Sequence, residues 1–126
     1  MNGFSKRVMT LRNYSSFEQG DVVVLELPYS DLRGAKLRPV LVLNAVDLGA
    51  DLIVAKVTGT PGPHRIALSQ EDLLEGRLKK TSYVDCSSIY TVEVAVVHAR
   101  IARVSPKKMH EVLNGISGIF GISHDY

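Results

Sequence analysis

Short apolar runs rich in β-branched residues recur along this chain, and polar or glycine- and proline-rich turns separate them. The runs span residues 21–28, 39–46, 51–58, 65–68, 81–92 and 94–104. Runs of this length and composition are typical of β-strands. The turn around Gly49 favours a hairpin between the second and third runs, because glycine tolerates a positive φ angle. Many short strands at near-regular spacing predict a small, mainly β barrel.

Two segments depart from the strand pattern. The first begins at Ser69 and has Asp72 three positions later, close to a capping box, which predicts one or two helical turns ending at Gly76. In the second, Ser105 is a predicted N-cap, Pro106 takes the first helical position, and apolar residues then recur at helical spacing. The chain is therefore expected to have a short helix after the fourth strand and a C-terminal helix.

The domain organisation follows from length and composition. Residues 1–16 mix basic residues with Ser, Asn and Gly without a sustained period, so we expect a loosely ordered N-terminal arm. Residues 17–126 are expected to form one barrel domain, because a chain of 126 residues lies in the usual single-domain range. With 45% hydrophobic and 22% charged residues, the composition is that of a globular protein rather than a disordered or fibrous one.

The basic residues are grouped along the chain. The net charge is only +2, so their distribution matters more than their total. One group lies within residues 33–38, a second within 77–80 and a third within 100–108. If the fold brings two groups to one face, a polyanion can bind there. The alternative is that each group lies on a separate solvated turn.

Cysteine and apolar content indicate the compartment. The single cysteine, Cys86, cannot form an internal disulfide, and the N-terminal residues lack the apolar core of a signal peptide. No apolar run approaches the roughly 20 residues that a membrane helix needs. We therefore expect a cytoplasmic protein without a membrane partner. One cysteine and four scattered histidines do not form a metal-ligand spacing, so neither a metal nor another cofactor is expected.

Arg38 and Pro39 stand together at the start of the second apolar run. Proline restricts the preceding residue to extended conformations, so the Arg38 guanidinium projects from a fixed backbone. A planar group with five donors suits phosphate oxygens. Gly34 leaves the preceding loop able to fold over a ligand. The alternative is structural: Arg38 pairs with Asp31 and closes the turn.

The order of motifs resembles the MazF/PemK family of toxins from about Gly20 to Phe120. The sequence has GD at the start of a strand, GxxxRP before the next, KVTGT after a further strand, and GRLKKTSYVDCSSIYTV before a short strand and the final helix. The GD and GxxxRP motifs are specific in combination and weak as isolated pieces.

The resemblance implies a homodimer built on an SH3-like barrel of the CcdB/PemK type with short helices. It also implies metal-independent cleavage of single-stranded RNA, and a cognate antitoxin whose disordered tail blocks the RNA groove. By position in the motifs, Arg38 matches the loop arginine that stabilises the pentavalent phosphate. Thr58 matches the strand-end threonine that contacts the scissile phosphate. These two are the expected catalytic residues.

The acid and base of the reaction are less well matched. Cleavage by the RNA's own 2′-hydroxyl needs a base, an acid for the leaving oxygen and a cation. In one branch of the family an Arg-Cys-Asp triplet supplies acid and base chemistry, whereas Asp85, Cys86 and Ser87 stand here. Strand alternation places Asp85 and Ser87 on one face, opposite Cys86. Asp85 could serve as a base if it points into the groove, and Asp85 and Ser87 are kept as candidate catalytic or RNA-binding residues whose roles stay open.

Further candidates lie in loops and strands. Histidine is a common acid or base near neutral pH, and Arg33 and Lys36 add loop cations, so His64, Arg33 and Lys36 are candidates for catalysis or RNA binding. The alternative for His64 is an exposed loop residue without a role. Tyr83 and Tyr90 either stack on unpaired bases or belong to the barrel core.

Three functions compete on this sequence. The preferred hypothesis is an endoribonuclease toxin with Arg38 and Thr58 at the phosphate. The second is a non-catalytic nucleic-acid or protein binding module on the same fold, which the altered triplet favours. The third is a toxin that acts by protein contact, like the related CcdB inhibitors of DNA gyrase. The loop arginine argues against this third function, because those relatives do not rely on it.

Overall fold

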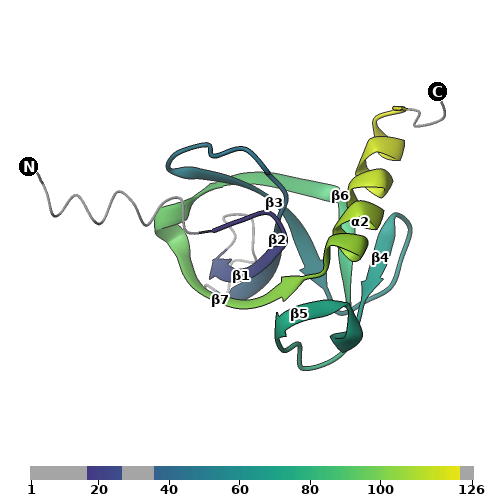
Figure 1. Ribbon diagram of the computed structural model, residues 1–126, viewed down its shortest axis with the longest axis horizontal. Coiled ribbons are helices and arrows are strands. Elements are labelled where there is room, and N and C mark those ends of the chain that lie inside the picture. The colour runs from purple at the N-terminus through teal and green to yellow at the C-terminus, as the bar shows by residue number, and fades with distance from the viewer. Residues whose placement is uncertain (1–16, 27–35, 123–126) are drawn as a thin grey trace, which may run out of the picture.

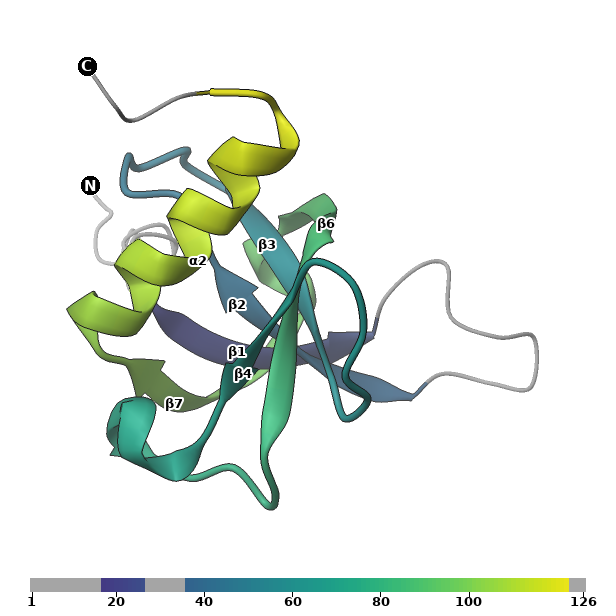
Figure 2. The ribbon, with the colours of Figure 1, turned by 90° about the vertical axis from the view of Figure 1, so that its right-hand side faces the viewer.

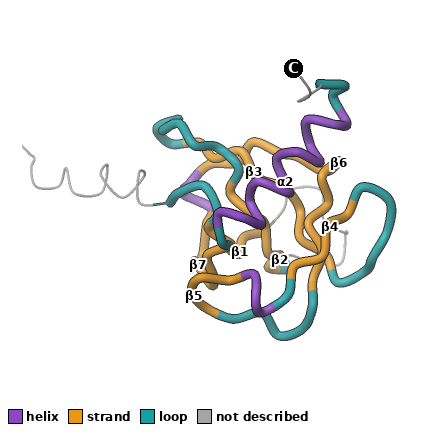
Figure 3. The backbone as a smooth tube through the Cα atoms, turned by 45° about the vertical axis from the view of Figure 1, so that its right-hand side comes forward, coloured by secondary structure: helices purple, strands orange, loops and turns teal. Residues whose placement is uncertain are grey.

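The computed structural model describes residues 17–26 and 36–122 (Figure 1). The strands are β1 (Asp21–Glu26), β2 (Leu37–Val42), β3 (Asp51–Thr58), β4 (Arg65–Leu68), β5 (Leu73–Gly76), β6 (Ser82–Glu93) and β7 (Val97–Val104). The helix α2 (Pro106–Ile119) follows β7, and the 3-10 turns η2 (Gln70–Asp72) and η3 (Val94–Val96) precede β5 and β7. The tube in Figure 3 makes the predominance of strands plain, so the predicted mainly β class is confirmed.

All described strands join one antiparallel sheet in the order β4-β6-β3-β2-β1-β7-β5. The long strand β6 pairs with both β3 and β4, whereas β7 pairs with β1 and β5. The sheet curls on itself into a half-barrel, which Figure 1 shows from one end. Helix α2 packs against β4 and β6 (Figure 2). The expected small barrel with a C-terminal helix is therefore confirmed.

Two apolar clusters form the core, and β3 contributes to both. Ala55 and Val57 face the cluster that includes Val112 of α2, whereas Leu52 and Val54 face a second cluster between β1, β2 and the end of β6. Side chains alternate across a strand, so one strand can serve two clusters. The β-branched runs of the sequence form the strands whose side chains build both clusters.

Helix α2 begins as its sequence predicts and packs closely. The Ser105 Oγ accepts a hydrogen bond from the Lys108 backbone N–H at 3.2 Å, and proline follows the cap. A Cβ at Gly115 would lie 3.0 Å from the Ile66 side chain and 3.1 Å from the Cys86 sulfur. Glycine at this position therefore lets the helix approach β4 and β6 closely.

The short helix predicted after the fourth strand is a single 3-10 turn, η2. Its predicted capping contacts form, because the Asp72 carboxylate accepts hydrogen bonds from the Ser69 N–H at 2.9 Å and the Ser69 Oγ at 3.1 Å. The next residues do not continue the helix but form β5, which pairs with the edge of β7. Leu73 packs on the first core cluster, so tertiary contacts outweigh the local helical pattern.

Several expectations fall outside the described part of the chain. These are the N-terminal arm at 1–16, the loop cation Arg33, and Asp31, the alternative partner of Arg38. Among the described helices, none is long and apolar enough to cross a membrane.

Candidate functional site

A cleft of about 1080 Å³ opens between the ends of β2 and β3 and the segment that links β5 to β6. Its apolar lining includes Val24, Pro39, Leu78 and Ile101. Its basic lining comprises Arg38, Lys56, Arg77, Lys79 and Lys80. The fold thus brings the second basic group of the sequence together with Arg38 of the first group.

The charge of this cleft is not neutralised within the described residues. No aspartate or glutamate is among its lining residues. None of its five basic side chains forms an ion pair with another described residue. A low-dielectric wall beside unpaired cations concentrates positive potential and attracts anions.

Strand β2 places Arg38 at the rim of the cleft. Arg38 pairs with Leu25 of β1, and Pro39 pairs with Val24, so both belong to the regular ladder. Pro39 is half-buried and lines the cleft, while the Arg38 side chain is exposed. The extended backbone expected from the proline is confirmed, because both residues lie within β2.

Strand β3 ends at Thr58, which lines the cleft. Leu52 and Val54 belong to the second core cluster, and the same strand face continues as Lys56 and Thr58, which both line the cleft. The two predicted catalytic residues, Arg38 and Thr58, therefore lie in one cleft. Lys56 was not predicted, although its position two residues before Thr58 on an otherwise apolar strand was a usable signal.

The carboxylate of Asp85 lies within a bulge of β6 rather than among the lining residues of the cleft. The bulge arises because Ala55 of β3 pairs with Ile89 whereas the next residue pairs with Asp85. The carboxylate accepts hydrogen bonds from the Ser87 N–H at 3.0 Å and the Ser87 Oγ at 2.6 Å. It also accepts one from the Ser88 Oγ at 3.1 Å.

An ion pair completes the environment of this carboxylate. Arg65 of β4 donates from Nε to Asp85 at 3.3 Å and from Nη1 to the Thr60 carbonyl at 2.8 Å. Burial alone would raise the pKa of Asp85, but hydrogen bonds from Ser87, Ser88 and Arg65 together hold it below its ordinary value. A carboxylate with a lowered pKa is a weak base, so its contacts indicate a role in holding the bulge.

The other candidates from the sequence lie outside the lining of the cleft. Ser87 is exposed and donates its hydroxyl to Asp85. His64 is exposed, has a φ of 60°, and its carbonyl accepts a hydrogen bond from the Cys86 N–H at 2.9 Å. Lys36 is exposed just before β2. The structure therefore does not bring these side chains together with Arg38 and Thr58, and their functional roles stay predictions.

Cys86 and the two tyrosines are strand residues. Cys86 is buried in the first core cluster, and its burial, with smaller effects of Asp85 and Glu111, raises the pKa of the thiol. Tyr90 packs against the second cluster, and Tyr83 is half-buried opposite Thr58. Neither tyrosine is among the lining residues of the cleft.

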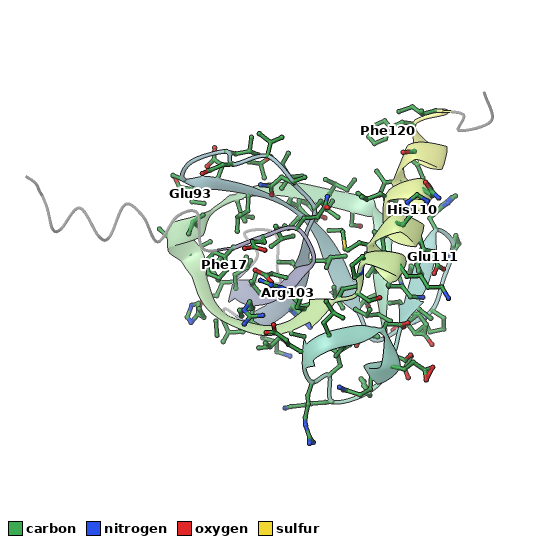
Figure 4. All side chains as sticks on the ribbon, in the orientation of Figure 1. Phe17, Glu93, Arg103, His110, Glu111 and Phe120 are labelled. Atoms are coloured by element: carbon green, nitrogen blue, oxygen red, sulfur yellow. The ribbon has the colours of Figure 1, made fainter. Side chains whose placement is uncertain are left out.

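Three of the four residues of the third basic group, Arg100, Arg103 and Lys108, are paired with acids instead. Asp21 of the GD motif is fully buried, and its carboxylate accepts hydrogen bonds from the Arg103 Nε and the Glu18 N–H, both at 2.8 Å. Arg100 lies 3.0 Å from the Glu75 carboxylate. Figure 4 labels Arg103 beside β1 and β7, where this network ties the two strands together. The GD motif therefore has a structural role, and in this group only Lys107 forms no ion pair with a described residue.

No three histidine, cysteine or acidic side chains gather as a metal site in the described ranges 17–26 and 36–122.

The fold and the cleft together define the class of protein: a curled half-barrel with a basic cleft at the ends of its strands. Residues 18–120 match the family described as "PemK-like, MazF-like toxin of type II toxin-antitoxin system". The chain belongs to this family. A comparison with curated protein sequences gave no match.

Solved structures show the same fold at low sequence identity. An endoribonuclease from a mycobacterial species, solved with its cognate antitoxin, gives a TM-score of 0.68 at 22% identity over 85% of this chain and 97% of its own. A MazE-MazF complex from Deinococcus radiodurans gives 0.67 at 18% identity over 85% and 98%. The toxin MazF-mt6 of Mycobacterium tuberculosis gives 0.66 at 18% identity over 82% and 98%.

Proposed function

We propose that this toxin is a metal-independent endoribonuclease that binds single-stranded RNA in the basic cleft. The observation that carries the proposal is the convergence of five basic side chains, without ion pairs to described residues, on one cleft. Unpaired cations suit a chain of phosphates. The apolar lining at Val24, Leu78 and Ile101 suits the face of an unstacked base, which only a single strand exposes.

The proposed reaction uses the RNA as its own nucleophile. The 2′-hydroxyl oxygen forms a bond to phosphorus and loses its proton, while the bond from phosphorus to the 5′-oxygen breaks and that oxygen gains a proton. The products carry a 2′,3′-cyclic phosphate and a 5′-hydroxyl. Arg38 donates hydrogen bonds to the phosphate oxygens and stabilises their added charge. The Thr58 hydroxyl donates to the same phosphate.

The second candidate function is a non-catalytic binding module for nucleic acid or protein. It is favoured by the absence of histidine and carboxylate side chains from the described lining of the cleft. An RNA strand bound in the cleft would contact cations, but no histidine or carboxylate that could act as a general base near pH 7. Under this function the cleft retains its affinity for RNA and leaves the strand intact.

We also propose an antitoxin partner and a dimer. Two of the structural relatives were solved with an antitoxin, and the unpaired cations of the cleft are complementary to an acidic antitoxin segment. Ile119, the last residue of α2, is 39% exposed, and the next residue, Phe120, is 69% exposed (Figure 4 labels Phe120). Apolar surface of this kind supports a homodimer. Light scattering on the purified protein tests the dimer directly.

The activity is tested with mixed-sequence single-stranded RNA and purified protein in EDTA. We expect fragments with 2′,3′-cyclic phosphate ends from the wild-type protein and strongly reduced cleavage with Arg38→Ala. Cleavage should be unchanged with Lys107→Ala, which removes an exposed cation on α2. RNA that stays intact but binds the folded wild-type protein would establish the second function. Cleavage by Arg38→Ala at the wild-type rate would contradict the role of Arg38.

A further inference from the structure

Residues 77–80 form one wall of the cleft, and the glycine that precedes them, Gly76, packs its backbone against β7. Gly76 has a φ of 83°, in the left-handed region that favours glycine. A Cβ at this position would collide with the Ile101 carbonyl oxygen and the Ala102 Cα. The Arg77 N–H donates to the Ile101 carbonyl at 3.3 Å. The start of the basic segment therefore has a fixed position on the sheet.

A single side chain clamps the same segment from the other side. The Gln70 amide donates from Nε2 to the Gly76 carbonyl at 2.9 Å and accepts from the Leu78 N–H at 3.3 Å. Gln70 itself is exposed, so it contributes little to the core. Its turn is anchored separately, because Asp72 caps the Ser69 N–H at 2.9 Å. These two hydrogen bonds order the loop before a ligand binds, so binding does not have to pay the entropy cost of ordering it.

The last residue of the segment reaches across to β3. A Cβ at Gly59 would lie 3.2 Å from both Cε and Nζ of Lys80, so the ammonium group lies directly over the Gly59 backbone. Gly59 follows Thr58, the residue proposed to contact the scissile phosphate. Lys80 forms no ion pair with a described residue. An anion held at Thr58 would therefore meet a second cation beside Arg38.

We propose that Lys80 is a phosphate-binding residue of this cleft and that Gln70 is the positioning residue that holds its loop in place. This inference rests on the proposed binding of RNA in the cleft. Lysine is a compact point charge, which suits one phosphate oxygen, whereas the planar Arg38 guanidinium suits two. A phosphate bound between Lys80, Thr58 and Arg38 would be contacted from both walls of the cleft.

The test measures binding of a fluorescent 2′-O-methyl single strand, which cannot be cleaved, at several salt concentrations. We expect Lys80→Ala to weaken binding about tenfold and to reduce the salt slope by about 0.7. Gln70→Ala should weaken binding about threefold, because ordering the free loop now opposes binding. The matched controls Lys107→Ala and Glu71→Ala change exposed residues outside the cleft lining and should bind like wild type.

A double variant distinguishes positioning from a general structural effect. If Gln70 acts through the loop, the effect of Gln70→Ala on binding should be smaller in a Lys79→Ala, Lys80→Ala background, and the unfolding midpoint of Gln70→Ala should match that of wild type. Wild-type affinity in Lys80→Ala, or an undiminished Gln70→Ala effect in that background, would overturn the inference while the proposed function stands. A wild-type protein that binds no single strand would overturn the proposed function itself, and this inference with it.

Discussion

Two basic regions of this molecule carry similar side chains but have opposite surroundings. On β7, Arg100 and Arg103 lie against carboxylates, including the fully buried Asp21. In the cleft, Arg38 and Lys80 face no described carboxylate. The comparison teaches that a run of basic residues indicates function only where the fold leaves its charge unpaired. The paired region stabilises the fold, and the unpaired region is available to an anionic ligand.

The largest expected effect is on stability and belongs to the paired region. Asp21→Ala should lower the free energy of unfolding by about 3 kcal/mol, because it removes the buried carboxylate that accepts hydrogen bonds from the Arg103 Nε and the Glu18 N–H. Urea denaturation measures the change. Arg38→Ala, the control from the cleft, should stay within about 0.5 kcal/mol of wild type. Equal stability of the two variants would remove the distinction between the regions.

The next effect is on activity and belongs to the cleft. Arg38→Ala should slow RNA cleavage by about 100-fold or more, because it removes charge stabilisation from the transition state. Arg100→Ala, which removes a paired cation, should stay within about twofold of the wild-type rate. Single-turnover cleavage of a labelled strand measures both rates. A larger loss with Arg100→Ala than with Arg38→Ala would reverse the comparison.

A smaller effect concerns the pH dependence of stability at the β6 bulge. Folding lowers the pKa of Asp85 from the ordinary 3.8, so its contribution is complete above that pH and is lost as the pH falls through the lowered pKa. Asp85→Asn should therefore cost about 2 kcal/mol at pH 7, and the difference from wild type should shrink below pH 3.8. Denaturation at pH 7 and at acidic pH measures it. A difference that grows on acidification would contradict this charge state.

The smallest effect is on the salt dependence of RNA binding. If all five cations of the cleft contact phosphates, the logarithm of affinity should fall with the logarithm of salt with a slope of about −3.5. Lys79→Ala should reduce the magnitude of this slope by about 0.7, and Arg100→Ala should leave it unchanged. Fluorescence titrations with an uncleavable strand measure the slopes. Equal changes for both variants would indicate a diffuse effect of net charge.

The strands and the C-terminal helix were predictable from the sequence. The β-branched runs and the Ser105 cap determine structure through local preferences, and tertiary contacts do not override them here. Arg38 and Thr58 were predicted as catalytic residues from the motifs of a known family; the structure brings them to one cleft, and their catalytic roles stay predictions. The segment Leu73–Gly76 was predicted as helical, and it forms β5 because the edge of β7 supplies a pairing partner.

The division of the basic residues into paired and unpaired groups could not be predicted from the sequence. Arg103 and Asp21 are 82 residues apart, and only the antiparallel pairing of β1 with β7 brings them together. Lys56 lines the cleft because the side of β3 that carries Leu52 and Val54 packs in the core only as far as Val54, and beyond it the same side faces the cleft. Asp85 was predicted as a candidate base, but the bulge that fills its hydrogen-bonding capacity depends on the register between β3 and β6.

The most direct test of the central claim, that RNA binds in the unpaired cleft, is a titration of isotope-labelled protein with the uncleavable strand, followed through backbone amide resonances. We predict that the largest shifts occur at Thr58, Gly59 and residues 77–80. The amides of Asp21 and Arg103 should not move. Shifts centred on Asp21 and Arg103, with residues 77–80 unmoved, would contradict the claim and transfer the binding site to the paired region.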